Sequence, residues 1–496
     1  MDFVRNFPFF SIMLSMFAGI LCSILPRRAA RWVNLGAVGT IGALSAGLLG
    51  YLLKTGESYT YLMGHFPAPW GNEIRAGVLE AGMALFFCVI MLLSLLGGQK
   101  KLEEEVAEEK QSLYFILMNL LLSSLLALLY TNDLFTAYVF VEINTISACG
   151  LIMIRGTGRT IEAAVRYMIM SLLGSGMLLL GICVLYDLTG HLLMSNIKEQ
   201  VALLAVSGEY HIPLMVCIGL MCVGLAIKSA LFPFHAWLPD AYGYSTVSSA
   251  AVLSSLVSKG YIFLLMKLIY RVIGFEVFKD SHIIDVLFVF GLMGMIFGSL
   301  SAIRENDIKR MIAFSSVAQI GYIYMGIGMG TQFAMAASVF HILSHAATKS
   351  LLFVATAGLC DVSGGSKHFV DLTGAAYRDK WAGAAFSVGA LSMVGVPLFS
   401  GFISKLLFAQ AAVNLSGRML PVLVVLGIST ILNAIYFMKT VIRIYTPVKE
   451  NGAKGNQDGR LLYPLVLCLF IALNVILGVN SQPIVDLIEQ GLQMFA

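Results

Sequence analysis

The sequence predicts an all-α membrane protein that crosses the bilayer about fourteen times. Hydrophobic residues make up 58% of the 496 positions and charged residues only 12%, with a mean hydropathy of +0.85. Soluble domains average about 45–50% apolar and about 25% charged residues. The apolar residues also gather in stretches of roughly 20, the length of a membrane-spanning helix. A soluble globule is excluded, and the wealth of large apolar side chains excludes a disordered chain.

The predicted spans follow one another along the whole chain. They lie at about 7–25, 32–53, 76–96, 113–130, 134–154, 161–186, 213–232, 246–270, 283–303, 308–329, 333–357, 382–410, 421–444 and 461–479. Pro26-Arg27-Arg28 follows the first stretch where a signal peptide would carry small residues, so this stretch is predicted to be a retained span.

The charges of alternate connections predict the orientation. One side carries 18 basic residues: Arg27, Arg28, Arg31, Lys100, Lys101, Lys110, Arg155, Arg159, Arg304, Lys309, Arg310, Lys367, Arg378, Lys380, Arg443, Lys449, Lys454 and Arg460. The other side carries 7: Arg5, Lys54, Arg75, Lys198, Arg271, Lys279 and Arg418. Because basic connections stay in the cytoplasm, both termini are expected outside the cell inner (cytoplasmic) membrane.

Composition and motifs exclude several functions. A net charge of +4 gives no indication of a nucleic-acid partner. The eight cysteines have no ligand spacing, and the chain has no nucleotide, haem or iron–sulfur motif. No cofactor, metal or catalytic centre is expected, so the energy for any transport must come from an ion gradient or another subunit.

Ionisable residues inside the predicted spans are the candidates for function. They are Glu142, Lys228, Lys259, His341, His345, Lys349 and Lys405. Each charge costs about 2.5–3.5 kcal/mol at the centre of a spanning helix, so such residues usually face water or protein and carry function. Arg166, Lys267 and Lys439 lie nearer span ends and are expected to reach the interface, as is Glu80.

His341, His345 and Lys349 recur every four residues, which places them along one helix face. The pattern lacks the acid of H-E-x-x-H, and Lys349 would repel a cation, so a metal site is disfavoured. A histidine in a membrane can also be a hydrogen-bonded packing residue. Two histidines in line with a lysine favour a proton path.

Two spans are predicted to be broken near a buried lysine. Pro233 and Pro239 follow Lys228, and Pro397 precedes Lys405. Paired interrupted helices mark the ion sites of inverted-repeat transporters. We therefore expect two five-helix repeats, at 111–275 (spans four to eight) and 276–450 (spans nine to thirteen). They are flanked by residues 1–110, with three spans and a cytoplasmic loop, and by the last span and tail at 451–496.

Four stretches resemble the antiporter-like subunits of complex I, of Mrp-type sodium/proton antiporters and of membrane-bound hydrogenases. The segment from Lys228 to Ala241 is similar to their seventh-span signature, and Asn132–Glu142 to their fifth-span acid motif. Residues 307–322 and 341–353 are similar to the ninth-to-tenth connection and the eleventh span. The resemblance covers roughly residues 110–410.

This resemblance implies fourteen helices with an inverted repeat, and a role for each buried charge. Glu142 would pair with Lys228, which would pass a proton toward Lys259. The helix face from His341 to Lys349 would then carry the proton to Lys405. Arg166 stands where family members often have lysine, and arginine holds its proton at ordinary pH.

The leading hypothesis is a subunit of the Mrp D type that moves protons, alone or in exchange for sodium, beside other membrane subunits, including further antiporter-like ones. The alternative within the same superfamily is a proton- or sodium-pumping subunit of a redox-driven complex, either NADH–quinone oxidoreductase or a Ni–Fe hydrogenase. A stand-alone solute transporter, a membrane enzyme and a passive scaffold fit the linear row of buried charges less well.

Overall fold

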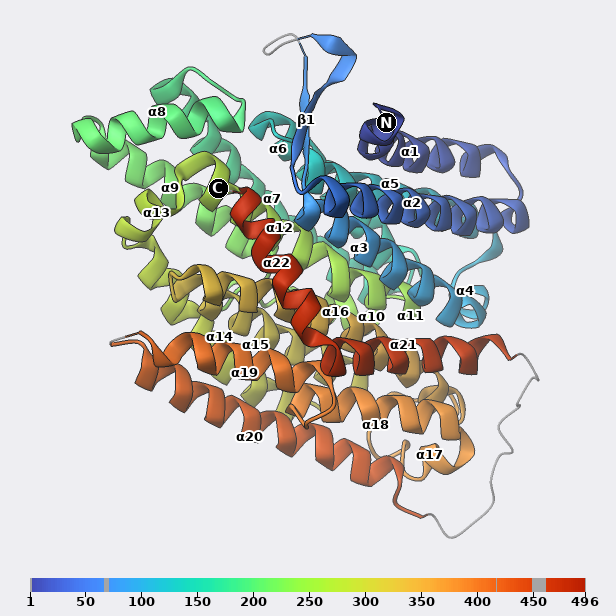
Figure 1. The fold of residues 1–496 in the computed structure, drawn as a ribbon. Coiled ribbons are helices and arrows are strands. Elements are labelled where there is room, and N and C mark those ends of the chain that lie inside the picture. The colour runs from blue at the N-terminus through green and yellow to red at the C-terminus, as the bar shows by residue number, and fades with distance from the viewer. Residues whose placement is uncertain (1, 67–70, 416, 448–460, 496) are drawn as a thin grey trace.

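The computed structural model describes residues 2–66, 71–415, 417–447 and 461–495. It is a bundle of roughly aligned long helices (Figure 1), and within the described residues 13 helices are long and apolar enough to cross a membrane. The predicted class, an all-α polytopic membrane protein, is confirmed. Lys449, Lys454 and Arg460, which contribute to the basic side of the charge count, lie outside the described residues.

The N-terminal part contributes three spans and a hairpin. Its helices are α1 (Phe7–Ile24), α2 (Arg27–Thr55), α3 (Val78–Gly97) and the short α4 (Gln99–Glu105), preceded by the 3-10 turn η1 (Asp2–Asn6). Between α2 and α3, β1 (Tyr59–Leu62) pairs antiparallel with β2 (Glu73–Ala76), with Tyr59 opposite Ala76, and the 3-10 turn η2 (Met63–His65) follows β1.

The next part runs from α5 to the eighth span. Its long helices are α5 (Glu108–Tyr130), α6 (Leu134–Met153), α7 (Gly158–Thr189) and α9 (His211–Lys228), with α8 (Met194–Ser207) before α9 and the short α10 (Leu238–Tyr244) after it. The eighth span alternates α-helix and π-helix as α11 (Val247–Val252), η3 (Leu253–Val257), α12 (Ser258–Lys267) and η4 (Leu268–Ile273).

The last part begins with the short α13 (Phe275–Asp280) and ends at the C-terminal helix. Its other helices are α14 (Ile283–Arg304), α15 (Ile308–Gly328), α16 (Gln332–Asp361), α17 (Ala375–Arg378), α18 (Lys380–Val394), α19 (Ser400–Val413), α20 (Met419–Ile444), α21 (Leu462–Val479) and α22 (Ser481–Phe495).

Both expected breaks are present, and each changes the predicted boundaries. The seventh span was expected over 213–232, but α9 ends at Lys228, and non-helical turns fill 229–237 before α10. The twelfth span, expected as one stretch over 382–410, is two helices, α18 and α19, separated by the turn that contains Pro397. A proline lacks the backbone N–H and clashes with the preceding turn, so a continuous helix is disfavoured at both places.

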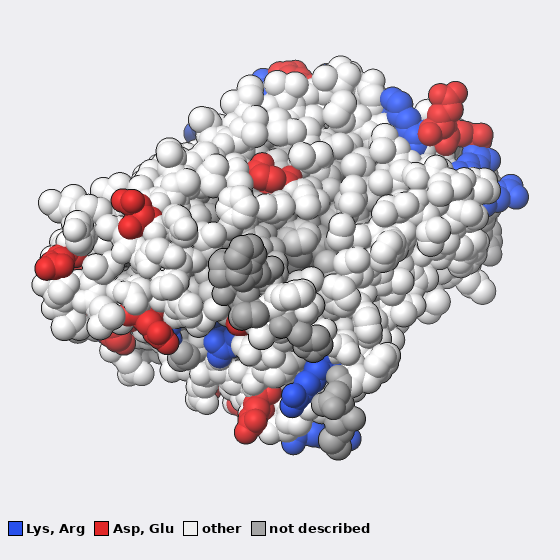
Figure 2. All heavy atoms as spheres, turned by 90° about the horizontal axis from the view of Figure 1, so that it is seen from above, with Lys and Arg blue, Asp and Glu red and all other residues white. Residues whose placement is uncertain are grey.

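The centre of the bundle is formed by three spans that are buried almost all round. The apolar windows of Val247–Ile273 and Gln332–Asp361 are 100% buried and that of Ile308–Gly328 is 94% buried. By contrast, α7 and α20 bury only 39% of theirs and expose large apolar side chains. Figure 2 shows the molecule from above, from the side of α1 and α2, and most of this face is uncharged, with most charged side chains toward its edges. Most of the candidate residues lie on the central spans and their neighbours.

Both chain ends lie beside the β1–β2 hairpin, on one side of the molecule (Figure 1). The Tyr59 hydroxyl donates to the Arg5 carbonyl at 3.0 Å. The Arg75 guanidinium donates to the Met494 carbonyl at 2.8 Å. The sequence predicts an even number of crossings, which would place both termini on one side of the membrane.

Candidate functional site

The seventh span brings Lys228 to the predicted acid. The Lys228 ammonium lies 3.7 Å from a Glu142 carboxylate oxygen, and it donates to Thr145 at 2.8 Å and Ser171 at 3.0 Å. It also lies 5.4 Å from the centre of the Tyr261 ring. The Lys228 side chain is fully buried and that of Glu142 is 25% exposed. Three elements, α6, α7 and α12, therefore surround one ammonium group.

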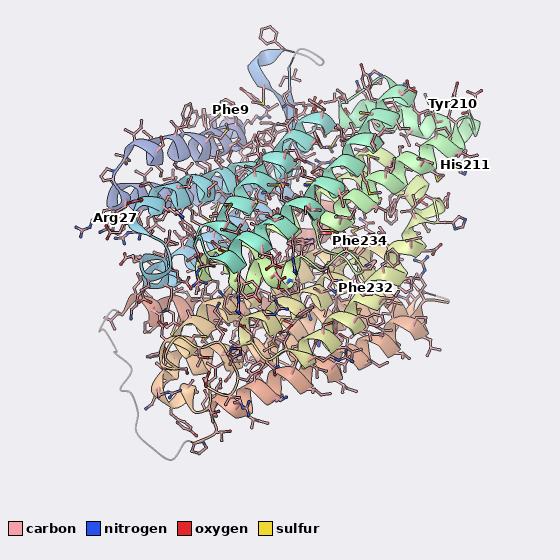
Figure 3. All side chains as sticks on the ribbon, turned by 180° about the vertical axis from the view of Figure 1, so that it is seen from behind. Phe9, Arg27, Tyr210, His211, Phe232 and Phe234 are labelled. Carbon is pink, nitrogen blue, oxygen red and sulfur yellow. The ribbon has the colours of Figure 1, made fainter. Side chains whose placement is uncertain are left out.

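Lys228 is also the last residue of α9. The carbonyl end of a helix carries partial negative charge, which favours a cation there. Figure 3 shows Phe232 and Phe234, in the break, between the end of the bundle with Arg27 and the end with Tyr210 and His211. The helix end thus lies inside the bundle, where a hydrated interface cannot stabilise the charge.

Lys259 lies at the start of α12 with no exposed surface. Its ammonium donates to the Ser254 carbonyl, which belongs to the π-helical turn η3. Isolated π-helical turns inside helices often occur at functional sites. Two residues further on, the Tyr261 hydroxyl donates to Asn144 at 3.0 Å and so connects this helix with α6.

The face predicted on the eleventh span exists as expected on α16. The rings of His341 and His345 are parallel, within 1°, with centroids 6.0 Å apart. His341 shares a hydrogen bond with Ser404, and Lys349 donates to the Ile312 carbonyl at 2.7 Å and to Ser315. Both ring nitrogens of His345 are buried and have no hydrogen-bond partner among the described residues. Buried polar atoms of this kind are normally satisfied by water, so this face suits a hydrated path.

Lys405 reaches back from α19 to the end of α18. Its ammonium donates to the Val394 carbonyl at 2.6 Å, to that of Met393 at 3.3 Å and to Thr430 at 3.1 Å. The break frees these carbonyls, because a continuous helix would use them in its own hydrogen bonds. Lys405 is 8% exposed. Lys228 thus ends one interrupted helix, and the Lys405 ammonium is held at the carbonyl end of another.

Tyr322 of α15 joins the histidine face to Lys405. Its ring stacks on His341 with centroids 5.3 Å apart, and the Lys405 ammonium lies 5.9 Å from its ring centre. Ser404, the partner of His341, precedes Lys405 on α19. The structure therefore brings His341 and Lys405 around one aromatic side chain.

Sequence reasoning missed a polar network behind this face. Ser392 and Ser400 both donate to the side-chain oxygen of Asn474, at 2.8 and 2.9 Å, and the Asn474 amide donates to Thr348 at 2.8 Å. Ser344 also donates to Ser400. Small polar residues are frequent in membrane helices, and only Asn474, within an otherwise apolar span, offered a signal.

Two residues expected at the interface are buried instead, and this corrects the prediction. Glu80 of α3 and Arg271 of η4 form an ion pair at 2.5 Å with side chains 1% and 2% exposed. Lys267 has no exposed surface and donates to the carbonyls of Leu128, Leu129 and Thr131 at the end of α5. The C-terminal helix α22 and the end of α5 cover these groups, so they pair with protein where water was expected.

Burial and the charges of Arg75 and Arg271 lower the pKa of nearby Lys198.

Arg166 and Lys439 lie where the sequence placed them. Arg166 is half exposed and pairs with Glu162 at 2.6 Å and Asp240 at 2.9 Å, and Lys439 is exposed. Lys309, at the start of α15, is buried and donates to the Ser245 carbonyl at 2.8 Å. Burial lowers the pKa of Lys367, which donates to Gly243 nearby.

The fold and the site together define a polytopic membrane protein with a row of ionisable side chains buried among its central helices. Residues 131–432 match the family described as NADH:quinone oxidoreductase/Mrp antiporter, transmembrane. The chain belongs to this family, as the resemblance predicted.

Two curated relatives illustrate the range of the family. The chain is 31% identical to NADH-quinone oxidoreductase subunit N of Desulforudis audaxviator over 506 aligned residues, covering 98% of each chain. It is 29% identical to the D-type subunit of the Na(+)/H(+) antiporter of Alkalihalophilus pseudofirmus, covering 71% of this chain and 70% of that one.

Two solved structures share the fold. A chain of the membrane-bound sulfane sulfur reductase, an archaeal respiratory membrane complex, superposes with a TM-score of 0.90 at 26% identity, covering all of this chain and 98% of that one. A chain of the Mrp complex from Dietzia superposes with a TM-score of 0.87 and full coverage of both; at 23% identity this is a likeness of fold.

Proposed function

We propose that this protein is the proton-translocating, antiporter-like subunit of a multisubunit membrane complex, and that it moves protons alone or in exchange for sodium. The observation that carries the proposal is the row of buried ionisable groups from Glu142 to Lys405, in a chain that belongs to the antiporter family. The named assemblies of its relatives and structural neighbours support a place among other membrane subunits.

The proposed path begins at the Glu142–Lys228 pair. Glu142 stabilises the protonated form of Lys228, because opposite charges 3.7 Å apart attract strongly in a buried setting. Thr145 and Ser171 accept hydrogen bonds from the same ammonium and hold it when the carboxylate is neutral. A change in the charge of this pair alters the free energy of protonating Lys259.

From Lys259 the path follows the face of α16 to Lys405. His341, His345 and Lys349 alternate along this face with hydroxyl groups that both donate and accept. Lys405 at the break in the twelfth span is the proposed exit, since the break interrupts the apolar helix there. Pro233, Pro239 and Pro397 maintain the two breaks.

The two broken spans also support the proposed repeats, 111–275 and 276–450, flanked by 1–110 and 451–496. Lys228 is the last residue of α9, and five spans later the Lys405 ammonium lies at the carbonyl end of α18. In the proposed orientation the basic connections face the cytoplasm, and both termini lie outside the cell inner membrane.

A second candidate is a pumping subunit of a redox-driven complex. The relative aligned over 98% of both chains is a NADH-quinone oxidoreductase subunit, and one structural neighbour belongs to a respiratory complex. The proposed path is the same in both, and the other subunits would supply a different driving force.

Glu142→Gln tests the proposal with little change of shape. In membrane vesicles that contain the assembled complex, we expect proton translocation to fall about a hundredfold, the scale of losing a positioned proton-transfer group. Glu209→Gln is the matched control, because Glu209 is exposed in the connection before α9. The double variant Glu142→Gln, Lys228→Met should assemble yet stay inactive. Near-normal transport in assembled Glu142→Gln would contradict the proposal.

The purified subunit alone is a second test of the same proposal. Because the chain carries no energy-transducing motif, coupled antiport is expected from the assembled complex and not from this subunit in liposomes. Robust exchange by the subunit alone would contradict its dependence on partners.

A further inference from the structure

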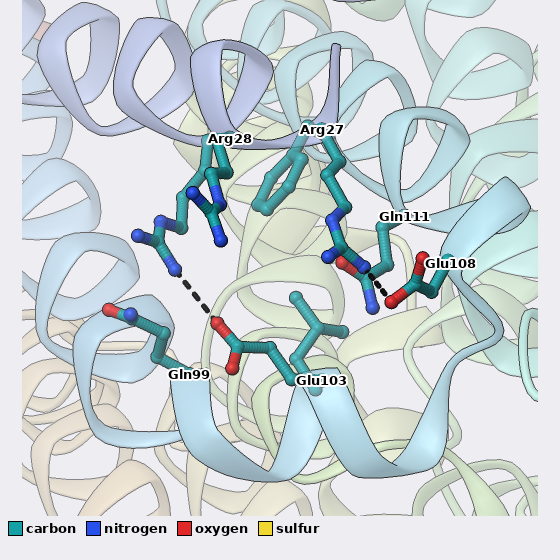
Figure 4. Close-up of a pocket in the computed structure, with 9 residues that line it drawn as sticks. Arg27, Arg28, Gln99, Glu103, Glu108 and Gln111 are labelled. Atoms are coloured by element: carbon teal, nitrogen blue, oxygen red, sulfur yellow. Dashed lines mark hydrogen bonds and ion pairs between the residues drawn. The ribbon is translucent and has the colours of Figure 1, made fainter.

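A cavity at the corner between α1 and α2 carries three arginines. Its volume is about 520 Å³, and its polar lining comes from Arg27, Arg28, Arg31, Gln99, Glu103, Glu108 and Gln111 (Figure 4). The arginines lie in the first two turns of α2, where Arg31 is four residues after Arg27 and three after Arg28, so its side chain shares a face with each of them. The walls opposite are α4 and the start of α5.

Two of the arginines are neutralised across the cavity. Arg31 pairs with Glu103 at 2.9 Å, and Arg27 pairs with Glu108. Arg28 forms no ion pair with a described residue, and Figure 4 shows its side chain pointing into the cavity. Three arginines and two glutamates leave one positive charge, so the cavity is suited to a single anionic group.

The guanidinium group favours phosphate among anions. Its planar N–H groups match two phosphate oxygens at once. The side-chain amide of Gln99, on the facing wall, can donate a further hydrogen bond. The volume lies in the range of about 300–1,000 Å³ that is usual for ligand pockets.

The surroundings indicate that this phosphate belongs to a lipid. α1 ends beside the cavity and exposes the apolar stripe Phe17, Ile20, Leu21 and Ile24, which are 51–79% exposed. Trp32, next to Arg31, is 65% exposed. A lipid with its phosphate in the cavity would lay its acyl chains along this stripe, whereas free phosphate would make no use of it. The cavity also lies on the more basic side, and basic pockets on the cytoplasmic side bind anionic headgroups.

We propose that this cavity binds the phosphate of an anionic phospholipid, with Arg28 as the main contact. The site is separate from the buried row and does not depend on the proposed transport. It would hold a lipid headgroup between α2, α4 and α5.

Native mass spectrometry of the purified complex, stripped of lipid and titrated with dioleoylphosphatidylglycerol, tests the proposal. We expect Arg28→Gln to weaken one lipid-binding event by about tenfold, as expected for the loss of a hydrogen-bonded charged group. Arg304→Gln makes the same chemical change at an exposed residue of the same basic side and should leave this event within about twofold. Arg28→Lys keeps the charge without the planar fork and should give an intermediate loss.

Three results would overturn the proposal. The first is equal lipid binding by Arg28→Gln and Arg304→Gln. The second is equally tight binding of dioleoylphosphatidylcholine, which carries no net charge. The third is displacement of the lipid by millimolar inorganic phosphate, which would make the cavity a site for free anions. Because Arg28 is exposed and forms no ion pair with a described residue, its variants should fold.

Discussion

At the scale of single residues, the buried lysines are held by carbonyl and hydroxyl oxygens more than by acids. Only Lys228 has a carboxylate within ion-pair distance among the described candidates. Lys259, Lys349 and Lys405 each donate to a backbone carbonyl. A carbonyl stabilises an ammonium less than a carboxylate does, so these groups can lose their protons at a smaller cost.

The clearest residue-scale prediction concerns Lys405. Lys405→Arg and Lys405→Ala should both lower transport by the assembled complex about a hundredfold, because a guanidinium with a pKa above about 12 cannot release its proton in each cycle. The measurement is the rate of proton-gradient change in vesicles, normalised to complex. Lys439→Arg, at an exposed lysine on α20, is the control. Normal activity of Lys405→Arg would give Lys405 a structural role instead.

At the scale of elements, the broken helices position the charges. In the twelfth span Gly395 ends α18 with a φ of +91°, a backbone conformation that residues with a Cβ rarely adopt. A Cβ at Gly395 would also come within 2.9 Å of Lys405 Cδ. The glycine therefore allows both the turn and the close approach of the lysine.

Gly395→Ala should accordingly destabilise the protein by about 1–3 kcal/mol and impair transport as well. The matched control is Gly427→Ala in α20, where an added Cβ meets nothing within 4 Å and helix propensity gains up to about 1 kcal/mol. Thermal unfolding in detergent gives the first quantity and vesicle transport the second. An unchanged melting temperature with full transport in Gly395→Ala would refute the role of this turn.

The Glu80–Arg271 pair connects α3 to the end of the eighth span. Glu80→Ala leaves Arg271 buried and unpaired, so a loss of about 3–5 kcal/mol is expected, seen as a lower melting temperature of the purified protein. Glu57→Ala, at an exposed acid after α2, should change stability by less than about 0.5 kcal/mol. If Glu80→Ala melts like the wild type, the buried pair contributes nothing to the fold.

At the scale of the whole molecule, the central spans that carry Lys259, His341, His345 and Lys349 are wrapped by helices from both halves of the chain. α1, α2, α7, α20 and α21 bury less than two fifths of their apolar windows and separate the centre from lipid. Charges on the central spans thus contact protein and internal polar groups. Such contacts lower the free-energy cost of placing a charge inside a membrane.

The charge bias gives the prediction for the whole molecule. Two exposed residues can report the orientation. Glu57 follows α2, and Lys380 begins α18. In intact cells, an impermeant maleimide should label Glu57→Cys and leave Lys380→Cys unlabelled until the membrane is opened, with exposed Cys183 replaced by serine in both. The reverse pattern would invert the proposed orientation.

The sequence by itself determined the class, the approximate spans, both breaks and the burial of Lys228, Lys259, Lys349 and Lys405, because apolar stretch length and proline chemistry are local properties. It also placed His341, His345 and Lys349 on one face, since helical periodicity alone decides that. The tertiary structure decided the partners. Glu80 and Arg271 are 191 residues apart, and Lys267 meets carbonyls more than 130 residues earlier. Whether a charge near a span end meets water or protein depends on which distant helix covers it, and no local pattern encodes that contact.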